Sequence, residues 1–236
     1  MIRYINLLFF AGVFTMNYLA NALPLNGKTT GQVSDNLSNL FAPAGLTFAI
    51  WGVIYLLLAI FCVLQFTPYA RNTAINLGWV FALSCIFNAA WLLAWHYERL
   101  PLSVLIMICL LMCLVFINMQ IKEQPNGLVK AAFGVYLGWI CIATIANVTA
   151  MLVSLDWNGL GISPVVWTII MIAVGTLIVS FTMLRLNNPY IGVAVVWAFI
   201  GIVIKRQADY RIIAVTALLA ILVVGFLTFR VFIKKT

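Results

Sequence analysis

The sequence predicts an all-α integral membrane protein with eight transmembrane helices. Hydrophobic residues make up 65% of the 236 residues and charged residues only 8%. Soluble domains average about 45–50% apolar and ~25% charged residues. A soluble globule of this length would therefore expose much apolar surface. Apolar runs recur along the chain between short segments of Pro, Gly, Asn or charge, a pattern typical of proteins with several spans.

Eight apolar runs are long enough to cross a bilayer, which takes ~20 residues of helix. They cover residues 4–23, 44–66, 76–97, 101–121, 131–154, 163–184, 188–204 and 211–233. The seventh run is the shortest, and a re-entrant segment there gives a seven-span alternative. The segment between the first two runs, residues 24–43, is the longest polar stretch.

Lysine and arginine predict the orientation. With eight spans, eight of the 13 basic residues lie on the side that holds both termini, and five lie on the other. The positive-inside rule then places both termini in the cytoplasm. The short loops suit a bacterial cytoplasmic membrane. The basic residues are scattered and form no patch, so we expect lipid contact and no nucleic-acid partner.

Acidic residues and catalytic motifs are scarce. The five carboxylates all fall in loops or at helix ends: Asp35, Glu98, Glu123, Asp156 and Asp209. Proton relays and cation-coupled carriers usually place carboxylates inside the membrane. No phosphate loop, His-Glu-x-x-His or Gly-x-Ser-x-Gly motif occurs. We therefore expect no catalytic residue, no metal site and no required cofactor. His96, the single histidine, is an interfacial hydrogen-bonding group or an axial haem ligand.

Aromatic and amide side chains share one face on each of three predicted helices. The positions are Phe48, Trp51 and Tyr55 after Pro43, then Asn88, Trp91 and Trp95 at i, i+3 and i+7, and Trp139, Ala143 and Asn147 at i, i+4 and i+8.

The two asparagines on these faces indicate how the helices pack. An amide in hydrocarbon costs free energy unless it is paired, so Asn88 and Asn147 should face protein. The simplest packing turns the three faces toward one interior. An interior of rings and a few amides is typical of a pocket for a flat apolar ligand. Interhelical hydrogen bonding with ring packing and no ligand is the alternative.

Gly134 and Gly138 form a small-xxx-small pair. Such a pair permits close approach of two helices, within one chain or in a homodimer.

The same three segments resemble the tryptophan-rich sensory protein (TspO) family, which includes the mitochondrial translocator protein, or peripheral benzodiazepine receptor. Residues 41–55 are similar to its Pro-Pro…Phe…Trp…Tyr segment, although Ala42 replaces the first proline. Asn88-x-x-Trp91 followed by Arg99 resembles its Asn-x-x-Trp helix. Tyr136-x-x-Trp139 with Ala143-Thr144-x-x-Asn147 resembles its Tyr-x-x-Trp…Ala-Thr-x-x-Asn helix.

The resemblance implies a five-helix ligand-binding bundle over residues 1–155, with a cavity near the long first loop. Residues 156–236 then add three transmembrane helices of unknown role. Family members bind porphyrins and haem-related tetrapyrroles, sterols and benzodiazepine-like drugs. Spacing and resemblance together give eleven candidate ligand-binding residues: Pro43, Phe48, Trp51, Tyr55, Asn88, Trp91, Trp95, Tyr136, Trp139, Ala143 and Asn147.

Three functions fit these observations. The first is a membrane receptor or carrier for a flat hydrophobic molecule, a porphyrin, other tetrapyrrole or sterol-like compound. The second is an enzyme that degrades porphyrin with light and oxygen, with Trp51 and Trp139 as candidates for radical chemistry. The third is a structural or regulatory membrane protein that acts through a protein partner.

Overall fold

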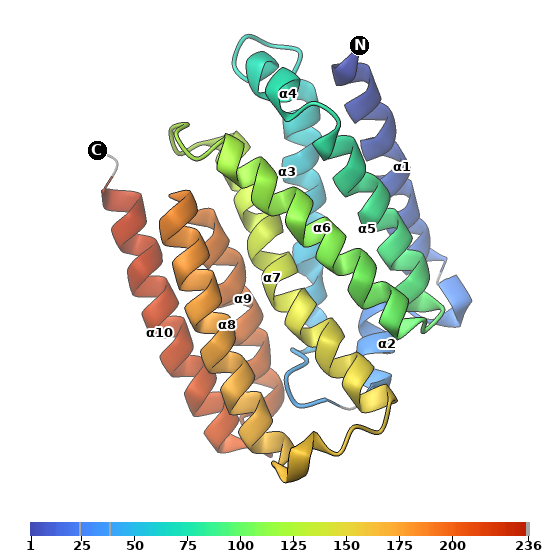
Figure 1. Ribbon diagram of the computed structural model, residues 1–236, viewed down its shortest axis with the longest axis vertical. Coiled ribbons are helices and arrows are strands. Elements are labelled where there is room, and N and C mark those ends of the chain that lie inside the picture. Colours follow the sequence, from blue (N-terminus) through green and yellow to red (C-terminus); the bar gives the residue numbers. More distant parts are fainter. Residues whose placement is uncertain (24, 38, 235–236) are drawn as a thin grey trace.

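The computed structural model describes residues 1–23, 25–37 and 39–234, which fold into helices joined by loops (Figure 1). The described residues form ten α-helices and three short 3-10 turns. The α-helices are α1 (Ile2–Ala22), α2 (Thr30–Asn36), α3 (Ile50–Leu64), α4 (Arg71–Leu77), α5 (Val80–His96), α6 (Leu100–Gln120), α7 (Leu128–Ser154), α8 (Pro164–Leu186), α9 (Tyr190–Arg206) and α10 (Arg211–Ile233). The 3-10 turns are η1 (Leu25–Gly27), η2 (Gly45–Ala49) and η3 (Gly159–Gly161).

Each of the eight predicted apolar runs contains one long helix. The helix ends lie within four residues of the predicted ones except at 44–66, where η2 comes first and α3 begins at Ile50. Among the described residues, five helices are long and apolar enough to cross a membrane, and two bent helix pairs raise this number to seven. The α9 helix has 17 residues and carries Lys205 and Arg206 in its last turn. The fold is thus that of a multi-pass membrane protein, and eight spans stays a prediction.

The run predicted at 76–97 is broken near its start, where α4 ends and α5 begins, which corrects the sequence interpretation. Gly78 has φ 53° and ψ −131° and ends α4, and α5 leaves at an angle of 68° to it. The left-handed φ favours glycine, which has no Cβ.

The polar segment between the first two spans contains a helix that the sequence interpretation missed. The Thr29 hydroxyl accepts a hydrogen bond from the Gln32 amide at 3.3 Å, and the Gln32 side chain accepts one from the Thr29 amide at 2.8 Å. This reciprocal pair is a capping box, and it starts α2. The pattern Thr-x-x-Gln was the sequence signal for it.

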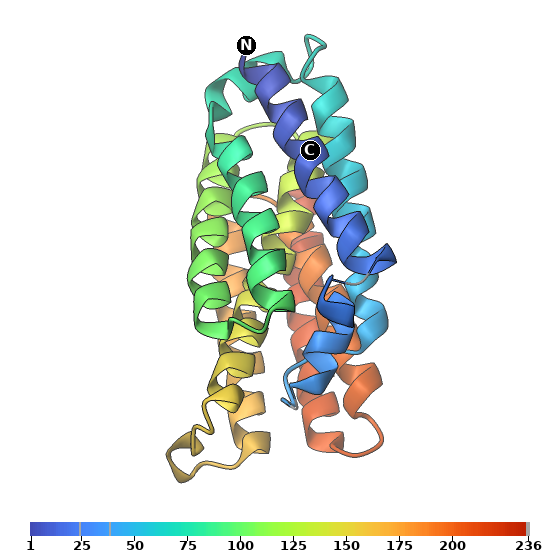
Figure 2. The same ribbon diagram turned by 90° about the vertical axis from the view of Figure 1, so that its right-hand side faces the viewer.

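The long helices form two groups that meet along α7 (Figure 1). On one side α7 packs against α3 and α6, and on the other against α8 and α9. Every residue from Val129 to Ile142 is buried. The N-terminus and the end of α10 lie at the same end of the molecule, and the segment with α2 lies at the opposite end, beside the lower ends of the last two helices (Figure 2).

Glycines bring α7 and α9 close together. A Cβ on Gly138 would collide with the carbonyl oxygen of Ile191, and one on Gly134 would collide with the Asn188 side chain. The predicted close contact at this pair is therefore made inside the chain. Two glycines of α9 serve its other neighbours: Gly192 faces Thr228 of α10, and Gly201 faces Thr47 of η2.

A buried amide pair holds the turn between α8 and α9 against the first group of helices. Asn188 donates to the Asn118 side chain at 2.8 Å and to the Lys130 carbonyl at 3.0 Å. Asn118 in turn donates to the Phe133 carbonyl at 3.0 Å. Buried apolar residues form one continuous cluster through both groups. The predicted domain boundary near residue 155 lies just after α7, and the division into two domains stays a prediction.

Adding one methyl group at the α7–α9 contact should destabilise the protein. We expect Gly138→Ala to cost about 1–3 kcal/mol, because its Cβ meets backbone rather than a movable side-chain end. The apparent Tm in detergent should fall by about 2–4 °C for each kcal/mol. The matched control is Gly225→Ala in α10, where a Cβ has no neighbour within 4 Å. An equal Tm for the two variants would contradict close packing at this point.

Candidate functional site

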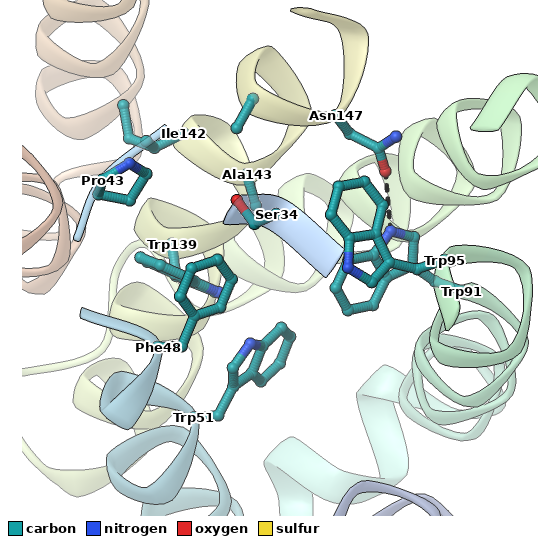
Figure 3. Close-up of a pocket in the computed structure, with 11 residues that line it drawn as sticks. Ser34, Pro43, Phe48, Trp51, Trp91, Trp95, Trp139, Ile142, Ala143 and Asn147 are labelled. Carbon is teal, nitrogen blue, oxygen red and sulfur yellow. Dashed lines mark hydrogen bonds between the residues drawn. The ribbon is translucent and has the colours of Figure 1, made fainter. Parts of the chain in front are cut away.

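A small cavity lies where α3, α5 and α7 meet the segment that contains α2 (Figure 3). It is lined by Ser34, Pro43, Phe48, Trp51, Trp91, Trp95, Trp139, Ile142, Ala143, Ala146 and Asn147. Four of the eleven lining residues are tryptophans, and all four are buried.

The structure places eight of the eleven candidate residues on this wall. The eight are Pro43, Phe48, Trp51, Trp91, Trp95, Trp139, Ala143 and Asn147. Tyr55, Asn88 and Tyr136 do not line it, and they form a buried hydrogen-bonded group behind Trp51. Ligand binding by any of the eleven stays a prediction.

Three wall residues were missed by the sequence interpretation: Ser34, Ile142 and Ala146. The signal for the last two was present, because they follow Trp139 at i+3 and i+7 on the same face of α7. Ser34 lies on α2, and its place depends on how that helix folds over the bundle.

Trp51 is the centre of the aromatic cluster. Its ring stacks on Tyr55 at 5.7 Å between centroids and on Trp91 at 5.9 Å. Trp91 stacks in turn on Trp95 at 5.8 Å. Tyr136 and Trp139 approach the Trp51 ring edge-to-face, and Phe48 does the same to Trp139. These are the geometries that aromatic quadrupoles favour.

Asn88 and Asn147 both join helices through hydrogen bonds. This agrees with the prediction that an amide, which is costly to bury in hydrocarbon unpaired, faces protein. Asn88 accepts from the Tyr55 hydroxyl at 3.3 Å and donates to the Tyr136 hydroxyl at 2.6 Å. This links α5 to α3 and α7. Interhelical hydrogen bonding therefore accounts for Asn88 without a ligand.

Asn147 makes the equivalent link on the cavity wall. It accepts from the indole nitrogen of Trp91 at 2.8 Å and donates to Ser103 at 2.7 Å. Figure 3 shows the first of these bonds crossing from α5 to α7. The two bonds fix the Trp91 ring, so this part of the wall has a set position.

Two indole groups in the cavity have no hydrogen-bond partner among the residues that the structure describes. They are the Nε1 groups of Trp51 and Trp139, and both atoms are buried. Phe48 lies beside the Trp139 ring in Figure 3, and the Trp51 ring meets Trp139 edge-to-face at 6.3 Å between centroids. A buried donor left unpaired costs about 1–3 kcal/mol. Four other indoles do have acceptors: Trp91, Trp95, Trp167 and Trp197. Of these six indoles, the two that lack an acceptor, Trp51 and Trp139, both line the cavity.

The cavity itself holds only about 30 Å³, roughly the volume of one water molecule. The rings pack on one another and fill the space. A polycyclic ligand would have to separate Phe48 from Trp51 and Trp139, or lift the segment that covers them.

The segment that contains α2 lies over the cavity, and we call its described residues, 25–37 and 39–43, the covering segment. One side of the covering segment is fastened to α5 and the turn that follows it. Lys28 forms an ion pair with Glu98. Asn26 donates to the His96 carbonyl at 3.0 Å, and Thr30 contacts the His96 ring at 3.0 Å through Nε2. The other ring nitrogen of His96 lies 3.2 Å from the Leu25 carbonyl. Both nitrogens are therefore engaged, which favours the interfacial role over an axial haem ligand.

The other side of the covering segment is fastened to the end of α9. Lys205 pairs with Asp35. Arg206 donates to the carbonyls of Leu40 at 3.0 Å and Asn39 at 2.7 Å. Just beyond the segment, the Trp197 indole donates to the Thr47 carbonyl at 2.8 Å. The α9 helix, the second-last of the chain, thus holds the segment that covers a cavity built by the first group of helices.

Metal-binding side chains do not gather here. Among the described residues, no group of three or more His, Cys, Asp or Glu side chains could hold a metal ion.

Comparison with known proteins identifies the family. A family model described as TSPO-like protein matches residues 3–230. The chain belongs to this family. The TSPO-like match includes α8, α9 and α10 as well as the earlier helices, and it confirms the resemblance predicted from the three motifs. It also supports a membrane protein that binds a ligand. No curated protein and no solved structure matches the chain.

Removing the Asn88 amide should destabilise this TSPO-like protein. Asn88→Ala leaves the hydroxyls of Tyr55 and Tyr136 without this partner, and we expect a loss of about 1–2 kcal/mol. Thermal unfolding of the detergent-solubilised protein measures it. Asn72→Ala, at an exposed position of α4, is the matched control and should unfold like the wild type. If both variants unfold alike, the Asn88 link contributes nothing.

Proposed function

We propose that this TSPO-like protein is a membrane receptor or carrier for a flat apolar molecule that bears hydrogen-bond acceptors, of the porphyrin or tetrapyrrole type. The unpaired indole groups of Trp51 and Trp139 carry the proposal. A ligand with oxygen or nitrogen acceptors would pair these donors, and its ring system would stack on the surrounding aromatic side chains. An apolar ligand without acceptors, such as a plain hydrocarbon, would leave both donors unpaired.

The proposed membrane arrangement has eight spans, with both termini in the cytoplasm of a bacterial cell. In that arrangement α9 crosses the bilayer largely covered by α7, α8 and α10. All five carboxylates lie outside the eight long helices. Coupling to protons or cations would need such groups in the interior, so we propose binding that is not ion-coupled.

Titration with protoporphyrin IX in the dark tests the proposal. Tryptophan quenching of the purified, detergent-solubilised protein follows binding, with inner-filter effects corrected by free tryptophan. We expect saturable binding. Trp51→Phe and Trp139→Phe each keep a ring but lose the N–H, and each should weaken Kd about three- to tenfold, or about 0.7–1.4 kcal/mol.

Two controls separate binding from folding. Trp79→Phe, at an exposed position, should leave Kd unchanged. In the absence of ligand, Trp51→Phe and Trp139→Phe break no hydrogen bond, because neither indole has a partner in the structure. We therefore expect no loss of Tm from a broken hydrogen bond in either variant. Linear quenching that is equal in all variants would overturn the tetrapyrrole proposal. Co-purification of a protein partner without ligand binding would favour the regulatory alternative.

Releasing the cover should speed ligand binding. Lys205→Ala combined with Arg206→Ala removes the contacts with Asp35, Asn39 and Leu40, so opening costs less free energy. We expect the association rate, measured by stopped-flow quenching, to rise at least threefold. Arg211→Ala, an exposed change at the same end of the molecule, is the control. An unchanged rate in the folded double variant would show that the cover does not limit access.

One observation favours a second candidate function, degradation of bound porphyrin by light and oxygen. Tyr55, Trp51, Trp91 and Trp95 form an unbroken row of stacked rings, each within 6 Å of the next. Indole and phenol rings are electron donors, so such a row suits the movement of an electron toward a photo-excited ligand. Loss of porphyrin absorbance that needs protein, light and oxygen would support it. If porphyrin absorbance falls equally in Trp91→Phe and in the wild type, the row of stacked rings has no role in the degradation.

A further inference from the structure

A second and larger cavity lies between α7 and α8, apart from the aromatic site. We name it the α7–α8 crevice. Its volume is about 400 Å³, within the ~300–1,000 Å³ of ligand pockets. It is lined by Asn39, Leu40, Val148, Thr149, Leu152, Val153, Trp157, Asn158, Gly159, Ile162, Pro164, Trp167, Thr168 and Met171. None of these residues lines the aromatic cavity.

The crevice exists because α7 and α8 separate toward their connecting loop. The helices approach closely at Gly175, where a Cβ would lie 3.1 Å from the Ile145 side chain. Beyond that point each helix turns one face to the gap. Positions 148, 149, 152 and 153 lie on one face of α7, and positions 164, 167, 168 and 171 lie on one face of α8.

The polar side chains of the wall bond within the protein. Thr149 and Thr168 donate to carbonyls of their own helices. The Trp167 indole donates to the Gly159 carbonyl at 2.8 Å. Asn39 accepts from the Ala42 amide and donates to the Leu37 carbonyl.

The crevice therefore differs chemically from the aromatic cavity. The wall is mostly apolar, and none of its buried polar side-chain atoms lacks a partner among the described residues. A ligand in the crevice therefore needs no polar group to pair with the wall, whereas the aromatic cavity contains two unpaired donors. A saturated hydrocarbon chain, which offers no hydrogen bond, matches this wall.

The position of the crevice suits a chain that enters from the bilayer. The α7 helix has 27 residues, about 40 Å at 1.5 Å per residue, and exceeds the ~30 Å hydrocarbon core. Trp157 and Trp167 pack together with ring centroids 5.2 Å apart at this end, and Trp157 is exposed. Tryptophan gathers at the level of lipid headgroups, so the crevice begins where an acyl chain begins.

We propose that the α7–α8 crevice binds one hydrocarbon chain of a membrane lipid. Eight of its fourteen lining residues come from α8 and from the loop that precedes it, so the added helices create this site. Its inner wall includes Asn39 and Leu40, whose carbonyls Arg206 holds. The chain would therefore rest against the segment that covers the aromatic cavity.

Photocrosslinking tests this proposal. The full-length protein is reconstituted in phosphatidylcholine vesicles that contain a small fraction of phosphatidylcholine with a diazirine in one acyl chain. After illumination, peptide mass spectrometry locates the adducts. We expect them to concentrate in residues 148–153 and 162–171 and to fall as unlabelled lipid with the same chain is added in excess.

A substitution that fills the crevice with a larger side chain should prevent these lipid adducts from forming. Thr149→Phe places a ring in the gap and should reduce adducts in both segments at least fivefold. The matched control is Leu177→Phe, on the exposed side of α8 and outside the crevice wall, which should leave them unchanged. A circular dichroism spectrum and Tm like those of the wild type show that each variant is folded.

Two outcomes would overturn the proposal. Adducts spread evenly along the exposed helices and unaffected by Thr149→Phe would mean ordinary lipid contact. Competition by protoporphyrin IX but not by excess lipid would mean that the crevice belongs to the aromatic site. The first outcome, and the effect of Thr149→Phe, do not depend on whether porphyrin binds in the aromatic cavity.

Discussion

Close contact between the backbones of α7 and α9 is the constraint on which the rest of the structure depends. It requires glycine at 134 and 138, where a Cβ would meet the Asn188 side chain and the Ile191 carbonyl. With its start fixed there, α9 extends to the far end of the molecule and brings Lys205 and Arg206 to the covering segment. The same placement leaves α8 and α10 to pack around α9. One pair of small residues thus links the two groups of helices and closes the aromatic cavity.

Paired and unpaired polar groups have different roles in this protein. The amides of Asn88, Asn118 and Asn188 are paired across helices, and such bonds give a membrane bundle a defined arrangement where apolar contact alone is unselective. The indole donors of Trp51 and Trp139 are buried at a cost that the ligand-free protein does not recover. Both donors lie at the wall of the aromatic cavity, where an acceptor atom on a bound molecule would pair them.

The sequence predicted the long helices well, because lipid makes apolar length a strong signal. It also brought together most of the cavity wall, since aromatic and amide residues at helical spacing must share a face. It could not predict contacts between residues about 150 or more positions apart, such as Trp197 with Thr47, or Lys205 with Asp35. No periodicity encodes which loop a helix end meets. The sequence also could not predict the small volume of the aromatic cavity or the existence of the α7–α8 crevice, because both depend on the angles at which helices cross.

The order of synthesis gives the cover of the aromatic cavity a special place in the assembly of the protein. The helices that build the cavity end at residue 154, whereas one set of its fastenings lies at Trp197, Lys205 and Arg206. The earlier part of a chain generally folds before the later part leaves the ribosome. During insertion the covering segment is therefore held by the first group of helices, through Lys28, Asn26 and Thr30 to α5 and the turn after it, without the contacts of α9. The newly made protein passes through a stage in which its aromatic interior is complete but only half closed.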